Sequence, residues 1–170
     1  QSNNGTVGGM DTRNNGYIVN WLLLGPITGI DVGEEGGCDP SVDFLDGDDT
    51  LAAPAIGDNV GGYTWTAWFE PGSEVELDDI MGGPTPHEAY AFAWVYSESE
   101  QNVTLAWGAD DGSRTWLNGE LVRNDPTCHG TVADQFQETV TLLAGWNRLM
   151  FKIHDQGGGF GVMARFKDDL

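Results

Sequence analysis

The sequence predicts an all-β domain, folded as a β-sandwich or jelly roll. Several segments alternate in residue character with the period of two that β-strands show, most clearly over residues 87–97. The chain has 25 glycines and seven prolines, many of them in turn-like stretches between these segments. No helical period of convincing length is visible. A pattern of about seven to ten short strands joined by glycine turns is typical of a sandwich.

The N-terminal third combines one strong strand with long loops. Residues 17–24, YIVNWLLL, are almost continuously apolar and stop at Gly25-Pro26, which predicts a strand buried on both faces. Residues 1–16 offer little to bury, so we expect a flexible arm before a single domain of residues 17–170. Residues 29–59 are loop-like. Their DGDD run lacks EF-hand spacing and is interpreted as a solvated loop, with a minor structural calcium site as the alternative.

Aromatic residues mark the middle strands. Residues 63–69 alternate and place Trp65 and Trp68 on opposite faces, so we expect that one of these rings is exposed. Residues 74–77 are predicted as a short edge strand. Residues 87–97 carry large aromatic side chains on one face and Ala or Val on the other. We expect the aromatic face to fill the core, and the small face to lie under another sheet or at the surface.

The C-terminal half is a series of strands joined by turns. Asn118-Gly119 is the strongest hairpin signal, because both residues readily adopt the positive φ of a tight turn. A long loop is expected at residues 123–136 and a glycine-rich hairpin loop at 154–159. The strands are predicted at residues 103–107, 114–117, 138–143, 146–153 and 160–166.

Charge and hydropathy exclude several classes of partner. The net charge is −20 and only seven residues are Lys or Arg, which argues against binding of nucleic acid or anionic lipid. No apolar run approaches the roughly 20 residues that span a bilayer, so membrane insertion is not expected. We also see no signal peptide, which suggests a mature chain or a fragment of a larger one. The acidity is compatible with calcium binding, a salty habitat or simple solubility.

The two cysteines, Cys38 and Cys128, lie in turn-rich segments. We expect them to form a disulfide that closes a loop of about 90 residues, which the chain-entropy model values at roughly 4–5 kcal/mol. A disulfide implies an oxidising, extracellular compartment. The alternative is two unrelated free thiols.

Asp110 and Asp111 are the strongest candidates for a metal site. They are adjacent on a short loop between two predicted strands, and calcium binds six to eight oxygen ligands of this kind at about 2.3–2.6 Å. In a sandwich, the loop at residues 155–159 can lie beside them and offer further oxygens. The alternative is that DDG is an ordinary turn, with or without calcium.

The sequence resembles the protective-antigen-type domain, a family of β-sandwich lectin modules. The resemblance lies in DDGSRTWLNGELV, a long loop with Asp125 and His129, VTLLAGWNRLMFKI and GGGFGVMARF, and it covers residues 91–166. This family includes yeast flocculin-type adhesins and modules attached to bacterial glycosidases. The front half, with NWLLLGPI and TWTAWF, is more similar to accessory sandwich domains of secreted bacterial proteins, often linked to polysaccharide breakdown. The implied sandwich is of jelly-roll, galactose-binding-like or protective-antigen type.

The resemblance implies a calcium ligand set. In lectin members two aspartates joined by a cis peptide hold a calcium ion that ligates sugar hydroxyls, and the matching residues here are Asp110 and Asp111. The usual third ligand, an Asn on the later loop, is replaced by Asp155 and Gln156. This departure bears on direct sugar ligation more than on calcium itself.

Sugar contacts are expected from one aromatic ring and several polar groups. Trp107, beside the aspartate loop, is the first choice for stacking on a pyranose ring. The other tryptophans in good strand alternation, Trp94, Trp116 and Trp146, are expected in the core. Hydrogen bonds to hydroxyls are expected from the hairpin and the long loop, although each of these residues is also plausible as plain surface: Arg114, Asn118, Arg123, Asp125 and His129.

These observations favour a secreted, non-catalytic carbohydrate-binding module that uses Ca²⁺ to bind a polysaccharide, as part of a larger multidomain protein. The alternative is a structural or protein–protein interaction module in which calcium only stiffens loops. Catalysis is not expected, because His87, His129 and His154 are scattered and no nucleophile elbow is present. A hydrolase would need a deep cleft with a carboxylate of raised pKa.

Overall fold

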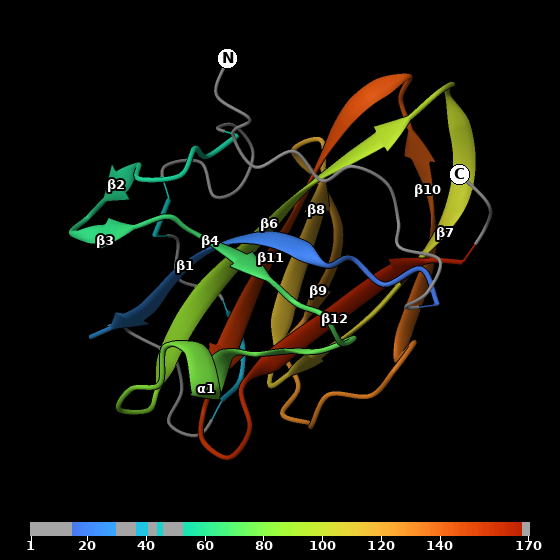
Figure 1. Ribbon diagram of the computed structural model, residues 1–170. Coiled ribbons are helices and arrows are strands. Elements are labelled where there is room, and N and C mark those ends of the chain that lie inside the picture. Colours follow the sequence, from blue (N-terminus) through green and yellow to red (C-terminus); the bar gives the residue numbers. More distant parts are fainter. Residues whose placement is uncertain (1–14, 30–36, 41–43, 46–52, 168–170) are drawn as a thin grey trace.

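The computed structural model describes residues 15–29, 37–40, 44–45 and 53–167, and within these ranges the protein is a β-sandwich of two antiparallel sheets (Figure 1). The predicted all-β class is therefore confirmed. The proposed arm at residues 1–16 lies almost wholly outside the described residues, and the DGDD run at 46–49 lies entirely outside them.

The larger sheet has six strands, in the order β4-β1-β6-β11-β8-β9. Their bounds are Thr66–Phe69 (β4), Asn20–Thr28 (β1), His87–Ser97 (β6), Gly145–Asp155 (β11), Ser113–Leu117 (β8) and Glu120–Asp125 (β9). The smaller sheet has the order β10-β7-β12-β5, and a separate pair is formed by β2 and β3. Their bounds are Phe136–Leu142 (β10), Gln101–Asp110 (β7), Gly161–Phe166 (β12), Val75–Glu76 (β5), Asn59–Val60 (β2) and Tyr63–Thr64 (β3).

The main core lies between the two sheets. Small residues of β6, such as Ala91 and Ala93, face bulkier side chains of the opposite sheet and of neighbouring strands, among them Leu105, Phe151 and Val162. All five are almost completely buried. Removing this apolar surface from water supplies most of the drive for the sheets to pack.

A second apolar layer covers the outer face of the six-stranded sheet. Tyr90 and Phe92 of β6 pack there with Trp116 and Met150 from neighbouring strands and with Trp65. The prediction that the aromatic face of β6 fills the core is confirmed for Tyr90 and Phe92, but they fill this second layer and not the space between the sheets, where the small face of β6 lies. The physical reason is that small side chains on β6 leave room between the sheets for the large side chains of β11 and β7. The aromatic rings of β6 are buried on the outer face by the residues of the second layer.

Three tryptophan predictions have different outcomes. Trp65 is buried and Trp68 is exposed, as their opposite positions in the alternation predicted. Trp116 is buried as expected. Trp146, predicted in the core, is 45% exposed beside Tyr96, because its strand position places it at the open end of the outer face.

The remaining differences concern strand ends. Strand β1 continues past Pro26, and its register against β6 shifts between Leu24 and Ile27, which accommodates a residue that lacks an N–H. The predicted edge strand at 74–77 shortens to β5, and a single helical turn follows, α1 (Leu77–Ile80). None of the helices in the described ranges is long and apolar enough to cross a membrane.

We expect Phe151→Ala to lower the free energy of unfolding by about 3–5 kcal/mol, because the ring is fully buried between the sheets and its removal leaves a cavity. Phe69→Ala is the matched control, since that ring is 61% exposed and its loss should cost less than about 0.5 kcal/mol. Urea unfolding followed by tryptophan fluorescence measures both. Equal losses would contradict the assignment of the core.

Candidate metal site

Loops from both sheets meet at one end of the sandwich. They are the β7–β8 turn with Asp110 and Asp111, the β9–β10 loop at residues 126–135 and the β11–β12 loop at 156–160, the last two drawn orange and red at the lower end of Figure 1. A cis peptide bond joins the two aspartates. Asp110 is the last residue of β7, so the first carboxylate is held by a strand rather than by a free loop.

Asp111 is fixed by backbone hydrogen bonds to the neighbouring strand and loop. Its N–H donates to the carbonyl of His154 at 2.8 Å, and its Oδ2 accepts from the N–H of Gln156 at 2.9 Å. The N–H of His154 in turn donates to the carbonyl of Gly112 at 2.9 Å. The carboxylate of Asp111 is therefore tied to the β11–β12 loop and is only 6% exposed as a residue.

Asp110 lies between glycines of the two other loops. A Cβ on Gly159 would overlap its carboxylate, and a Cβ on Gly130 would lie 3.7 Å from its Oδ2. Glycine at these positions lets the backbone of both loops come close to the carboxylate. Backbone carbonyls and a carboxylate are ligands of the type that calcium uses.

Negative charge accumulates around Asp110. Burial, together with the carboxylates of Asp111, Asp155 and Glu74, raises its pKa to about 6, and His129 acts against this rise. The pKa of Asp155 is also raised by burial, although the N–H of Gly157 and the ring of His87 oppose the shift. A bound cation would relieve this repulsion and hold Asp110 ionised at neutral pH.

Asp155 and Gln156 take other positions than the sequence suggested. Asp155 is the last residue of β11 rather than part of the hairpin loop, and it is 1% exposed. One oxygen lies 3.2 Å from Nε2 of His87 and the other accepts from the N–H of Gly157 at 2.6 Å. Gln156 contacts Asp111 through its backbone N–H, while its side-chain oxygen lies 3.4 Å from Nε2 of His154.

A disulfide between Cys38 and Cys128 borders the aspartates, and it closes the 90-residue separation expected from the sequence. Within the described ranges, the one group of three Cys, His, Asp or Glu side chains whose ligand atoms lie within 4.8 Å of one another is Cys38, Asp111 and Cys128, and its two sulfurs are bonded to each other. A cation at this end would therefore depend on the two aspartates, backbone carbonyls and water. A Cβ on Gly112 would overlap the carbonyl of Cys38, so this segment packs directly against the aspartate turn.

His129 of the β9–β10 loop is hydrogen-bonded to Asp125, the last residue of β9. Nε2 of His129 contacts Oδ2 of Asp125, and Nδ1 contacts Nε2 of Gln135 at 2.9 Å. The hydroxyl of Thr127 donates to the other oxygen of Asp125 at 2.6 Å. Both oxygens of the buried Asp125 are thus used in contacts with the loop, while the ring of His129 is close enough to Asp110 to act on its pKa.

Trp107 cannot stack on a sugar, because it is 1% exposed and packs against Phe136 and Phe151 with ring centroids 5.5 and 6.2 Å away. This prediction is wrong. The alternation that places Trp107 on the same face as the buried Val103 and Leu105 was the signal that it points into the core.

The other predicted sugar contacts are not gathered at the aspartates. Nε of Arg114 donates to Oδ1 of Asn124 at 2.8 Å. Asn118 lies at the β8–β9 turn and donates to the side chain of Asn147 at 2.8 Å. Arg123 contacts Glu138 at 3.1 Å on the open side of the sandwich. Asn118 therefore lies at the opposite end of β8 from the aspartate turn, and Arg123 is paired with Glu138.

A buried charged network next to the site was missed from the sequence. Glu88 of β6 lies 3.6 Å from Nζ of Lys152 and 3.5 Å from Nδ1 of His154, and all three are at most 1% exposed. Burial acts to lower the pKa of His154, but hydrogen bonds to Glu88 and Gln156 outweigh it and raise the pKa. Only the register, which sets Glu88 opposite His154, reveals this network.

Comparison with known proteins finds solved structures that are similar to this chain in fold. No family model matches the chain, and no curated protein of similar sequence was found. Among solved structures, a β-glucosidase from Kluyveromyces marxianus aligns with a TM-score of 0.51 and 10% identity over 88% of this chain. The PA14 domain of the MpAFP antifreeze protein aligns with a TM-score of 0.45 and 12% identity, over 91% of this chain and 82% of that one. A β-glucuronidase from Faecalibacterium prausnitzii aligns with a TM-score of 0.43 and 16% identity, over 79% of this chain and 20% of that one.

The chain spans only 14% of the length of the β-glucosidase that it matches. At this level of identity the match shows that the two share a β-sandwich fold and nothing about activity.

The raised pKa of Asp110 gives a pH test on the metal-free protein. A carboxyl group with a folded-state pKa of about 6 and an ordinary value of 3.8 holds its proton more tightly when folded, so its contribution to stability is lost as pH rises from about 4 to 6. With chelator present, Asp110→Asn should therefore be more stable than the parent at pH 7, by about 1 kcal/mol after allowance for solvent screening, and should lose this advantage at pH 4. Urea unfolding at both pH values measures it. The exposed Glu98→Gln is the control, and an equal pH profile for all three proteins would contradict the prediction.

Proposed function

We propose that this protein is a non-catalytic carbohydrate-binding module that holds Ca²⁺ at Asp110 and Asp111 and binds a polysaccharide there. The observation that carries the proposal is the pair of adjacent carboxylates at the end of β7, approached by the loops at Gly130 and Gly159, where burial and neighbouring negative charge raise the pKa of Asp110 to about 6. The resemblance to the protective-antigen-type lectins supports it, since their two metal-binding aspartates match Asp110 and Asp111.

The residues present fit a calcium ion. Asp110 and Asp111 would supply carboxylate oxygens, and the loops at Gly130 and Gly159 would supply backbone carbonyls, with water completing the six to eight ligands. The N–H of Gln156 holds one oxygen of Asp111 and thereby orients the other. Asp155 would contribute its charge to the site while it remains paired with His87.

Recognition of sugar at such an ion needs no bond making. Calcium, when bound with open positions, attracts vicinal hydroxyl oxygens of a glycan. The protein's part is to hold the two aspartates rigid through β7 and β11, so that binding does not require the loops to be ordered first. A disulfide beside the site fits a secreted module, because such bonds persist in oxidising compartments. The small share of the β-glucosidase that the chain spans supports a place within a larger protein.

An interaction module is the second candidate. Strands β9 and β10 are edge strands of the two sheets on the same side of the sandwich, and exposed edges are templates for pairing with another chain. In this function calcium would only stiffen the loops around Asp110.

Exposed aromatic rings offer an alternative place for sugar within the carbohydrate-binding proposal. Trp146 and Tyr96 are 45% and 50% exposed, with ring centroids 5.1 Å apart, and Trp94 packs beside them. His87 and Asp155 lie at one end of the paired strands β6 and β11, and these aromatic rings lie at the other end. Sugar bound to the rings would therefore not contact the ion.

We expect calcium to raise the midpoint of thermal unfolding relative to chelator, and Asp111→Asn to abolish most of this rise, because one of the two carboxylates is lost. Titration calorimetry should show at least a tenfold weaker calcium affinity for this variant. Glu98→Gln, an exposed acid outside the site, should bind calcium like the parent. If Asp111→Asn and the parent bind calcium equally, the ion is not at this turn.

Binding to a panel of plant, algal and microbial polysaccharides tests the function directly. We expect binding with calcium, loss of binding with chelator, and loss in Asp111→Asn while the fold is retained by circular dichroism. Trp146→Ala is the informative comparison, since it removes an exposed ring far from the aspartates. Binding that survives chelation but is lost in Trp146→Ala would move the glycan to the aromatic rings. The absence of binding to every glycan would contradict the carbohydrate proposal for that panel.

A further inference from the structure

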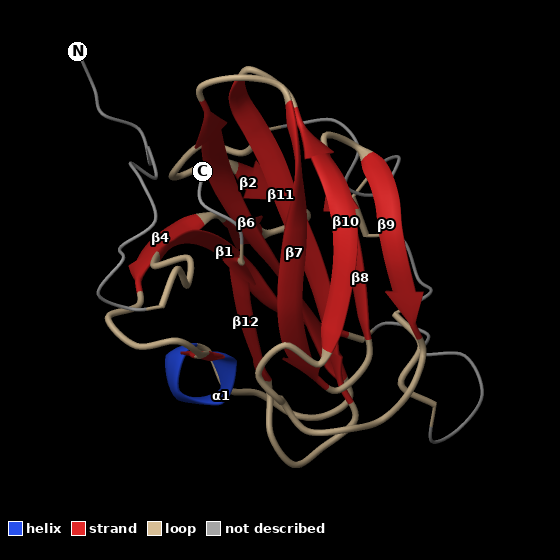
Figure 2. Cartoon of the chain, turned by 90° about the vertical axis from the view of Figure 1, so that its right-hand side faces the viewer, coloured by secondary structure: helices blue, strands red, loops and turns tan. Residues whose placement is uncertain are grey.

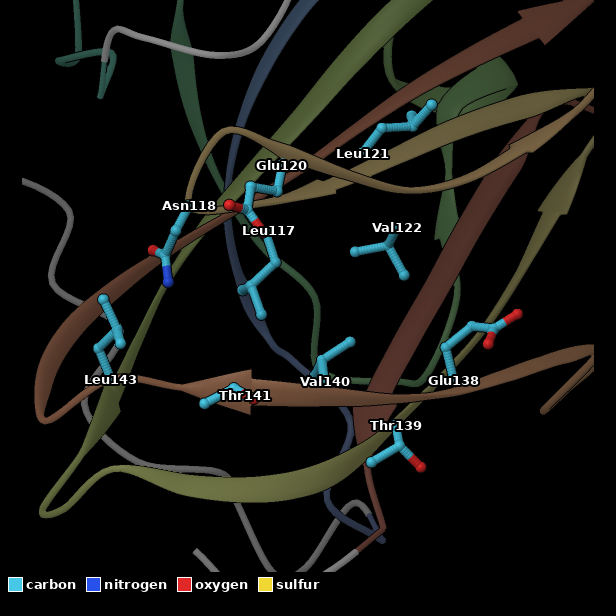
Figure 3. Close-up of a pocket in the computed structure, with 10 residues that line it drawn as sticks. All are labelled: Leu117, Asn118, Glu120, Leu121, Val122, Glu138, Thr139, Val140, Thr141 and Leu143. Atoms are coloured by element: carbon cyan, nitrogen blue, oxygen red, sulfur yellow. The ribbon is translucent and has the colours of Figure 1, made fainter.

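A groove of about 490 Å³ opens on the side of the sandwich where the two sheets end (Figure 3). Its walls are the β8–β9 hairpin and strand β10, which lie beside each other in Figure 2. Leu117, Val122 and Val140 point into it, and the side chain of Thr139 points away. It runs from the middle of β10 toward Leu143, away from the aspartates.

The backbone of β10 presents hydrogen-bonding groups along this groove. The N–H of Lys167 donates to the carbonyl of Thr104, so Thr104 of β7 directs its backbone groups toward β12 rather than toward β10. Thr139 is the register partner of Thr104. The two residues therefore form a non-hydrogen-bonded pair of the antiparallel ladder between β7 and β10. Its own N–H and C=O point to the open edge, and the same holds for the residues two positions away, Gln137 and Thr141.

Strand β10 is the better template of the two edge strands. Its seven residues pair with β7 without interruption, and no strand in the described part of the chain pairs with its other edge, which is therefore regular over its whole length. Strand β9 shifts register against β8 between Thr115 and Trp116, and such irregularities twist an edge away from further pairing.

The residues that line the groove indicate which kind of ligand it can bind. The side chains that point into the groove are aliphatic, and none of the described residues that line it is aromatic, which suits apolar peptide side chains better than sugar rings. Among the described residues that line the groove, the charged ones are Glu120 and Glu138, of which Glu138 is paired with Arg123, and the protein as a whole carries a net charge of −20. An extended peptide with positive charges matches this surface in shape and in charge.

We propose that the groove binds an extended basic peptide segment of another protein, which adds as a strand to the free edge of β10. Alternate apolar side chains of the peptide would fill the space between Leu117, Val122 and Val140. A Lys or Arg side chain of the peptide would lie near Glu120, whereas Glu138 is already paired with Arg123. This interaction is independent of the calcium site, because the groove extends from mid-strand toward the opposite end of the sandwich.

The probe is a fluorescein-labelled nine-residue peptide in which Lys and Val alternate, and the control peptide has Glu in place of Lys. Fluorescence polarisation should show saturable binding of the Lys peptide and none of the Glu peptide, with and without calcium. Thr139→Pro should weaken binding at least tenfold, because it removes an outward N–H without touching the β7–β10 ladder. Thr139→Ala keeps that N–H and should change binding less than twofold.

Glu120→Gln gives a second test at an exposed site where misfolding is not expected, and should weaken binding about threefold. Thermal unfolding midpoints equal to that of the parent establish that each variant folds. The proposal is overturned if the Lys peptide does not bind, if the Glu peptide binds equally well, or if Thr139→Pro binds like Thr139→Ala. Binding of a neutral glycan in the groove, in a protein that does not bind the Lys peptide, would likewise overturn it.

Discussion

The pairing of β6 with β11 is the constraint on which the rest of the structure depends. The two strands match over eleven residues each, from Ser97 opposite Gly145 to His87 opposite Asp155. Because side chains alternate, a slip of one residue in either strand would send the charged network around Glu88 into the space between the sheets. The register thus decides at once what fills the core, what forms the outer layer and which groups lie near the aspartate turn.

The paired strands β6 and β11 hold the candidate site in place. Asp111 is bonded to the backbone of His154 and Gln156, at the end of β11, and Asp155 is held by His87 of β6. Asp111 is therefore positioned by the centre of the larger sheet, whereas Asp110 is the last residue of β7 in the smaller one. A site that joins both sheets is held in place by the packing of the whole sandwich.

Sequence reasoning recovered what is local and missed what depends on register. The alternation and turn residues predicted most strands, because strand period and tight-turn chemistry act over a few residues. Alternation separates two faces but does not say which one meets the other sheet, which is why the aromatic face of β6 and Trp146 were misplaced. The pairing of Glu88 with His154, and the remoteness of Asn118 from Asp110, follow only from which strands are neighbours.

The burial of Lys152 determines where the protein can be coupled chemically through a lysine side chain. The chain contains two lysines, and the ammonium of Lys152 is closed off beside Glu88. Lys167, just beyond β12, is the side-chain amine that remains open to solvent. Reagents that acylate lysine side chains would therefore act mainly at Lys167, at the far end of β12 from Asp110. Molecules coupled through that residue to a bead or a sensor would be tethered at the end opposite the aspartates, with their loops directed outward.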